Sequence, residues 1–216
     1  MLFLQYMDKK HIITLTGKPG SGKSSTADRV AELLGYTRYS SGSMVRDILH
    51  EQGMTLAEYN QKAKDDHSLD TKVDEKLRNL REANDVVIDA RLGFYWIPES
   101  FKVYLDLDID VAIARIFKDS ISNQGRIKSG EQASDLAAAS ESVRTRMREE
   151  QERFHKLYNI DPFNTSRFDL IIDTSRHSPE TVALTVYDTY RKWLKSETWT
   201  QVKSAIPMGY SFKNSY

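Results

Sequence analysis

Residues 17–24 constrain this chain more than any other stretch. They read Gly-Lys-Pro-Gly-Ser-Gly-Lys-Ser and fit the pattern G-x-x-x-x-G-K-[ST], between a β-branched run at 11–16 and an apolar helical stripe over 24–34. Glycines at this spacing let backbone N–H groups turn inward and, with the N-terminus of the following helix, surround a phosphate. A glycine-rich turn without a ligand would require neither the Lys-Ser pair nor three glycines.

This loop predicts a site for a nucleoside triphosphate. Lys23 is expected to reach the β- and γ-phosphates, and the Ser24 hydroxyl is expected to ligate Mg²⁺. The residues expected to surround the phosphates are Gly17, Lys18, Pro19, Gly20, Ser21, Gly22, Lys23, Ser24 and Ser25.

The composition excludes several classes of protein. The 216 residues suit one domain with inserted lobes, and the 31 basic and 31 acidic side chains leave no net charge to attract nucleic acid. Cysteine is absent and the five histidines are scattered, which excludes disulfides and the common zinc motifs. No secretory signal is recognisable, and no window approaches the ~18 apolar residues of a membrane span. We therefore expect a cytoplasmic monomer that binds neither nucleic acid nor membrane.

Strands and helices alternate along the chain. Predicted strands cover 11–16, 37–40, 86–89, 101–106 and 170–173, and predicted helices cover 24–34, 41–53, 55–64, 70–82, 111–120, 135–158 and 179–195. Asp110 is expected to cap the helix at 111–120. Continuous apolar strands between helices predict an α/β fold: a five-stranded, mostly parallel sheet in three layers, with helices on both faces and ligands at the carboxyl ends of the strands.

The pattern indicates a single domain, 1–216, built from several parts. The core is expected at 10–41, 84–120 and 168–195, and a helical lobe at 42–82. The polar segment 121–134 has the composition of a lid, so a lid and its following helix are expected at 121–158. The tail 196–216 has no recognisable period, and no element is predicted there.

Asp89 ends a predicted central strand, where it can hold a water on the Mg²⁺ bound at Ser24. A simple turn or cap role is the alternative, and it is the favoured reading for Asp106 and Asp173, which also end strands. Trp96 is a candidate for lining a base pocket, although a packing role is favoured.

A second, phosphate-bearing substrate would require arginines, because the planar guanidinium matches phosphate geometry. Arg46, Arg91, Arg146 and Arg153 are the candidates. Solvated surface charge is the alternative for each, and Arg146, Glu150 and Arg153 have the spacing of a helical ion-pair ladder.

Five stretches together resemble the archaeal-type branch of cytidylate kinase, one of the P-loop nucleoside monophosphate kinases: 17–24, 41–46, 53–60, 86–93 and 153–161. The resemblance spans about 10–194. It implies a P-loop NTPase fold with a helical NMP-binding lobe and a short lid, and phosphoryl transfer from ATP to CMP or dCMP, with Mg²⁺. Ser41, Arg46 and Arg91 match monophosphate-site positions, and Arg146 and Arg153 match arginines that flank the phosphates on the lid side.

The catalytic candidates are accordingly Lys23, Asp89, Arg146 and Arg153. A phosphate acceptor is already mostly a dianion at neutral pH, so no general base is needed. One alternative is a P-loop kinase of a nucleoside or small alcohol, with Asp89 as general base. A second is a nucleotide-binding regulatory protein without turnover, because Ala90 stands where the family usually has glycine. An adenylate kinase would be expected to carry Asp-Gly-Phe-Pro-Arg, which this chain lacks.

Overall fold

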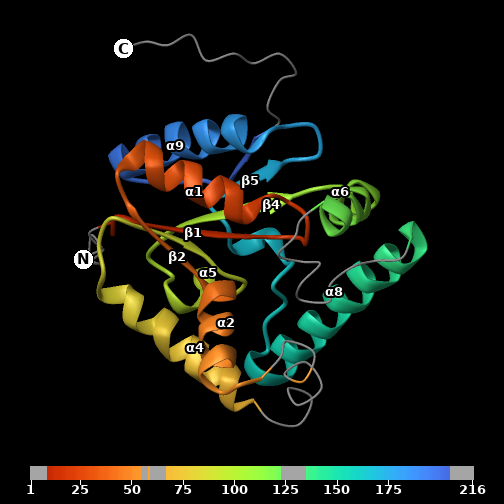
Figure 1. Cartoon of the computed structure of the whole chain (residues 1–216). Helices are drawn as coiled ribbons and strands as arrows, with labels where there is room; N and C mark the ends of the chain where they lie inside the picture. The colour runs from red at the N-terminus through yellow and green to blue at the C-terminus, as the bar shows by residue number, and fades with distance from the viewer. Residues whose placement is uncertain (1–8, 55–57, 59–66, 123–134, 205–216) are drawn as a thin grey trace.

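The computed structural model describes residues 9–54, 58, 67–122 and 135–204, and it contains one parallel sheet (Figure 1). The six strands lie in the order β2-β3-β1-β4-β5-β6. Their bounds are β1 (Ile12–Gly17), β2 (Thr37–Ser40), β3 (Val86–Asp89), β4 (Phe101–Asp106), β5 (Leu170–Asp173) and β6 (Val202–Ser204). The predicted α/β class is confirmed.

The predicted strand count of five was wrong, because β6 adds a sixth strand within the tail where no element was predicted. It pairs with β5, with Leu170 opposite Val202. Its three residues, Val-Lys-Ser, lie at the edge of the sheet and are at least partly exposed. So short and polar a segment has no periodicity to detect, and only pairing with β5 defines it as a strand.

Helices cover both faces of the sheet, which confirms the predicted three layers (Figure 1). On one face α1 (Lys23–Leu34) packs against α9 (Pro179–Lys195), over a core that includes Leu15, Val103 and Tyr190. The other face carries α2 (Ser41–Glu51), α4 (Ser68–Asn79) and the short α5 (Gly93–Trp96). Two short 3₁₀ turns complete these segments: η1 (Leu80–Glu82) directly follows α4, and η2 (Thr165–Arg167) precedes β5.

Two further helices, α6 (Ile109–Ser122) and α8 (Leu136–Tyr158), pack side by side beyond the edge of these layers (Figure 1). Buried Ile113, Ala139 and Val143 form their contact. All of the predicted helix at 55–64 except residue 58, and most of the predicted lid, 123–134, lie outside the described residues. Among the helices that are described, none is long and apolar enough to cross a membrane.

The ends of the helices follow local capping chemistry. Asp135 accepts a hydrogen bond from the N–H of Ala138 at the start of α8, as a capping aspartate does. At α6 the prediction was wrong: Asp108, rather than Asp110, accepts from the backbone N–H groups of Asp110 (2.8 Å) and Val111 (3.4 Å). The helix begins two positions earlier than predicted, at Ile109, so the capping position moves with it.

Candidate active site

The phosphate-binding loop of residues 17–22 lies between the carboxyl end of β1 and α1, and close backbone approach explains its glycines. A Cβ atom on Gly17 would lie 2.2 Å from the carbonyl oxygen of Leu105 on β4. Gly22 directly precedes α1 with a left-handed φ of 80°, a conformation that costs other residues energy. The glycines therefore let the loop pass close to β4 and lead directly into the N-terminus of α1, a position where anions bind.

Lys23 folds back over this loop. Its Nζ donates to the carbonyl oxygens of Gly17 and Lys18, each at 3.1 Å. Burial, and then the charge of Arg91, lower the pKa of the Lys23 ammonium from 10.5 to about 7, although nearby Asp89 opposes the shift. A phosphate beside this side chain would favour its charged form.

Ser24 and Asp89 meet at the carboxyl ends of β1 and β3. The Ser24 hydroxyl donates to Oδ2 of Asp89 at 2.7 Å, and Nη2 of Arg38 lies 3.4 Å from the same oxygen. Asp89 is only 6% exposed, whereas Ser24 is exposed. The donor set is a hydroxyl and a carboxylate, which are hard oxygen ligands of the kind that Mg²⁺ takes together with substrate phosphates.

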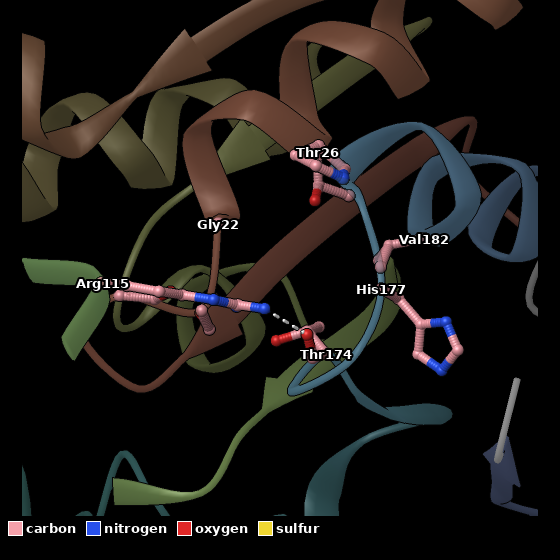
Figure 2. Close-up of a pocket in the computed structure, with 9 residues that line it drawn as sticks. Gly22, Thr26, Arg115, Thr174, His177 and Val182 are labelled. Atoms are coloured by element: carbon pink, nitrogen blue, oxygen red, sulfur yellow. Dashed lines mark hydrogen bonds between the residues drawn. The ribbon is translucent and has the colours of Figure 1, made fainter. Parts of the chain in front are cut away.

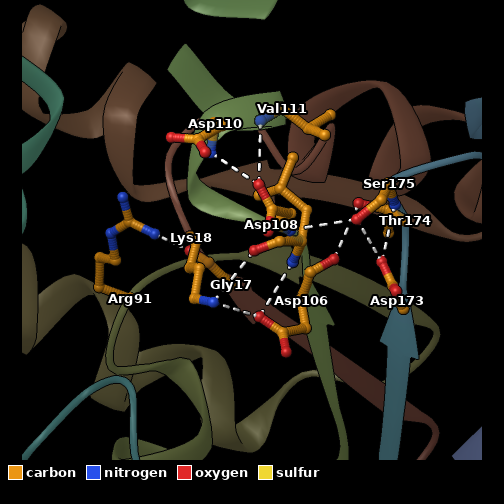
Figure 3. A network of polar contacts seen from close by, with 11 residues as sticks. Gly17, Lys18, Arg91, Asp106, Asp108, Asp110, Val111, Asp173, Thr174 and Ser175 are labelled. Atoms are coloured by element: carbon orange, nitrogen blue, oxygen red, sulfur yellow. Dashed lines mark hydrogen bonds and ion pairs between the residues drawn. The ribbon is translucent and has the colours of Figure 1, made fainter. Parts of the chain in front are cut away.

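Arg91 joins the loop after β3 to the P-loop and to α8. Its Nη1 donates to the carbonyl oxygen of Gly17 (Figure 3), and its Nε lies 2.7 Å from Oε2 of Glu150. Oε1 of Glu150 accepts from Nε of Arg146 at 3.0 Å. Burial by itself raises the pKa of the Glu150 carboxyl, but Arg91 and Arg146 outweigh it and lower the pKa to about 2.

The network of Figure 3 also fixes the P-loop against the end of β4. Nζ of Lys18 lies 2.7 Å from Oδ1 of Asp106 and donates to the carbonyl oxygen of Leu107 at 3.0 Å. The same Asp106 oxygen accepts from the N–H of Leu107. Asp106 therefore makes a turn contact, as expected, and also anchors the P-loop.

The structure brings together Lys23, Ser24, Asp89, Arg91 and Arg146, but it places other predicted residues elsewhere. Arg153 lies toward the helical lobe, with Nε 3.8 Å from Oδ2 of Asp70 on α4. Arg46 is exposed on α2, which Ser41 begins, and makes no ion pair within the described part of the chain. Ser25 is exposed in the first turn of α1.

Trp96 packs between elements of the fold, which is the role favoured from the sequence over lining a base pocket. Its Nε1 donates to Asp74 on α4 at 2.8 Å, and the Tyr158 hydroxyl at the end of α8 donates to the same carboxylate. The guanidinium carbon of Arg78 lies over the Trp96 ring, 3.9 Å from the ring centroid. This cluster joins α4, α5 and α8.

A cavity of about 210 Å³ opens beside the P-loop (Figure 2). Its walls are residues 20–22 together with Thr26, Arg115, Thr174, His177, Pro179 and Val182. Nη2 of Arg115 donates to the carbonyl oxygen of Thr174 at 2.7 Å. The hydroxyls of Ser21 and Thr26 are buried and have no hydrogen-bond partner among the described residues.

Several of these residues were not predicted from the sequence. From the sequence, Glu150 was predicted only to take part in a helical ion-pair ladder with Arg146 and Arg153. Its i,i+4 spacing to Arg146 did indicate the Arg146–Glu150 pair. Nothing local signals its contact with Arg91, or the positions of Arg38 and Arg115, because these depend on how separate elements pack.

Comparison with known proteins identifies the family. The family model described as "Cytidylate kinase-like family" matches residues 12–176. The chain belongs to the cytidylate kinase-like family. Relatives in this family include the cytidylate kinase of Haloquadratum walsbyi, 33% identical over 168 residues that cover 76% of this chain and 81% of that protein. The cytidylate kinase of Methanocella arvoryzae is 33% identical over 177 residues, covering 82% and 94% of the two chains.

The fold of this family member is shared with other kinases of known structure. The shikimate kinase of Bacteroides thetaiotaomicron superposes with a TM-score of 0.58, covering 86% of this chain and 98% of that one at 15% identity. Shikimate kinase from Acinetobacter baumannii gives a TM-score of 0.55 at 14% identity, with 88% and 97% covered. At such identities the likeness concerns the fold alone.

Proposed function

We propose that this protein transfers the γ-phosphoryl group of ATP to a nucleoside monophosphate, with CMP or dCMP as the acceptor. The observation that carries the proposal is Arg91, which extends from the end of β3 to the P-loop carbonyl of Gly17 and pairs with Glu150. A guanidinium beside the phosphate loop suits a reaction between two phosphates. Membership of the cytidylate kinase-like family, and relatives named cytidylate kinase, support CMP as the acceptor.

The donor would occupy the loop and the cavity beside it. The triphosphate would lie on the backbone N–H groups of residues 17–25, with Lys23 turning from the loop carbonyls to the β- and γ-phosphates. The nucleoside would enter the cavity of Figure 2, where the guanidinium of Arg115 would supply a flat cationic group for stacking. The hydroxyls of Ser21 and Thr26 would there find hydrogen-bond partners.

Ser24 and Asp89 would hold Mg²⁺. The Ser24 hydroxyl would serve as a direct ligand, and Asp89 would hold one of the bound waters. Mg²⁺ in this position supplies charge neutralisation at the β- and γ-phosphate oxygens. The hydrogen bond of 2.7 Å from the Ser24 hydroxyl to Oδ2 of Asp89 holds these two candidate metal-ligating oxygens side by side before the nucleotide binds.

The acceptor would approach from the side of the helical lobe at 42–82. Arg91 and Arg146 would offset the charge of its phosphate, with Ser41, Arg46 and Arg153 as further contacts on that side. An acceptor phosphate oxygen then forms a bond to the γ-phosphorus, the bond to the β–γ bridging oxygen breaks, and ADP leaves with the electron pair. The residues from 121 to 158 would act as a lid and its supporting helix, excluding water.

A phosphate acceptor fits Asp89 better than the alternative, a hydroxyl acceptor. As a general base Asp89 would need to face the acceptor hydroxyl. Its Oδ2 instead accepts from the Ser24 hydroxyl at the start of α1 and lies 3.4 Å from Nη2 of Arg38. This arrangement suits a metal-holding carboxylate.

The proposal is tested by measuring ADP release from ATP and Mg²⁺ with CMP, dCMP, UMP, AMP, GMP and a set of simple alcohols. We expect the highest kcat/KM with CMP or dCMP, and loss of turnover in Lys23→Ala. Turnover with the alcohols equal to that with CMP would contradict the proposal, as would tight ATP binding with no turnover on any acceptor.

A further inference from the structure

Arg38 makes a contact with the candidate metal site that no sequence pattern indicates. On β2, Arg38 lies opposite Val87 and Ser40 lies opposite Asp89, so Arg38 and Asp89 are diagonal neighbours on adjacent strands. Such neighbours are within reach of a long side chain. Nη2 of Arg38 lies 3.4 Å from Oδ2 of Asp89, the oxygen that also accepts from Ser24.

A second carboxylate holds Arg38 in this place. Its Nε lies 2.8 Å from Oδ1 of Asp28, on the helix α1 that follows the P-loop. The Arg38 side chain is 27% exposed and that of Asp28 is 60% exposed, whereas Asp89 has only 8% of its side chain exposed. Arg38 therefore connects a solvent-exposed carboxylate, Asp28, to a buried one, Asp89.

The burial of the Asp89 carboxylate explains what Arg38 does there. A carboxylate as buried as Asp89 needs a positive partner and hydrogen bonds, because an unpaired buried charge is costly. Arg38 supplies the charge before any ligand is present, and Ser24 supplies the hydrogen bond. Lysine could not replace Arg38 fully, because one ammonium group cannot span two carboxylates as a guanidinium does.

We propose that Arg38 is a positioning residue for Asp89. It fixes the carboxylate beside Ser24 and neutralises it, so that a divalent cation binds there together with the nucleotide and not by itself. This inference builds on the proposed ATP and Mg²⁺ site. It does not depend on which acceptor the protein phosphorylates.

The direct test is cation binding to the protein without nucleotide, with Mn²⁺ as the probe and electron paramagnetic resonance as the readout. Arg38→Gln should bind Mn²⁺ on the order of tenfold more tightly than the wild type, since one repelling charge near the site is removed. The gain should vanish in Arg38→Gln/Asp89→Asn. With saturating MgATP and acceptor, the kcat of Arg38→Gln should fall on the order of tenfold below that of the wild type, because one charge-assisted contact no longer fixes Asp89.

Matched variants separate this role from general stability. Arg29→Gln removes an arginine of α1 that pairs with Glu32 and Glu180 instead, and it should leave both readouts at wild-type values. Asp28→Asn removes a negative charge and frees the outer end of Arg38 to pair with Asp89, so it should weaken Mn²⁺ binding without nucleotide, opposite to Arg38→Gln, and lower kcat by a smaller factor. Asp28→Asn provides the test if Arg38→Gln does not fold.

The inference is overturned if Arg38→Gln and Asp28→Asn lower only the melting temperature and leave Mn²⁺ affinity and kcat unchanged. It is also overturned if the Mn²⁺ gain persists without the Asp89 carboxylate. Because the Mn²⁺ measurement needs no acceptor, failure to phosphorylate CMP would refute the proposed function and leave this result standing.

Discussion

Nε of Arg91 lies 2.7 Å from Oε2 of Glu150, in an ion pair between the loop after β3 and the middle of α8. Glu150 is 8% exposed, and Arg91 also contacts the P-loop through Gly17. One buried carboxylate therefore holds a candidate phosphate-binding arginine against the loop that would hold ATP. The two halves of the proposed site are connected before any substrate binds.

Glu150→Gln should weaken both the fold and the site. Removing one member of a buried ion pair leaves Arg91 uncompensated, which costs about 3 kcal/mol of the free energy of unfolding. Urea denaturation measures this loss, and kcat/KM for the acceptor should fall on the order of tenfold as Arg91 loosens. Glu149→Gln changes an exposed neighbour on α8 and is the control. Equal effects of the two substitutions would contradict a role for the Arg91 contact.

Lys23 should make both stability and ATP binding depend on pH. Its pKa in the fold, about 7, lies below the ordinary 10.5, so the unfolded chain binds more protons between these values. The free energy of unfolding of the wild type relative to Lys23→Met should therefore be lowest below pH 7 and should rise as the pH approaches 10.5. Chemical denaturation across this range tests the sign.

The same low pKa predicts proton uptake when ATP binds above pH 7, because the triphosphate favours charged Lys23. Calorimetry in buffers of different ionisation enthalpy would measure it. Binding at pH 8 without proton uptake, in a protein that does bind ATP, would show that Lys23 is already charged in the free state.

Gly17→Ala should disturb the P-loop by direct collision. The new Cβ would lie 2.2 Å from the Leu105 carbonyl oxygen, so the loop must move away from β4. We expect a loss of several kcal/mol in the free energy of unfolding, as for other severe backbone clashes. Gly22→Ala meets no atom within 4 Å and carries only the cost of its left-handed φ, about 1–2 kcal/mol. Thermal melts that rank Gly22→Ala as the more damaging change would contradict this geometry.

Thr26→Val separates binding from stability in the cavity beside the P-loop. The hydroxyl of Thr26 is buried without a hydrogen-bond partner among the described residues. Its replacement by a methyl group should leave the melting temperature equal or higher, because a buried unpaired polar group is removed. If this hydroxyl bonds to the donor nucleoside, ATP affinity should fall about tenfold. Unchanged ATP affinity would place the nucleoside elsewhere.

Much of the fold could be predicted from the sequence, because its signals are local. The glycine spacing at 17–24 indicates a phosphate loop without reference to distant residues. Apolar runs and helical stripes predicted five of the strands and the long helices, and the family resemblance was confirmed by the match over 12–176. For the same reason Ser24 and Asp89 could be paired in advance: parallel strands bring their carboxyl ends together.

Other predictions remain open or needed correction. The single-domain arrangement, the lid at 121–134 and the expected monomer stay predictions, as do the roles of Ser41, Arg46 and Arg153 in binding the acceptor. The expected cap of α6 was two residues off because the sequence offers two aspartates, Asp108 and Asp110, and only the backbone geometry selects between them.

The sequence by itself determined the phosphate loop, the alternation of strands and helices, and the family, since each depends on residues close together in the chain. Tertiary structure alone decided the sixth strand, the bridge from Asp28 through Arg38 to Asp89, and the pair of Arg91 with Glu150. The physical reason is that an ion pair between separate elements, or an edge strand of three residues, forms only where packing brings the partners within contact distance. No local pattern encodes that distance.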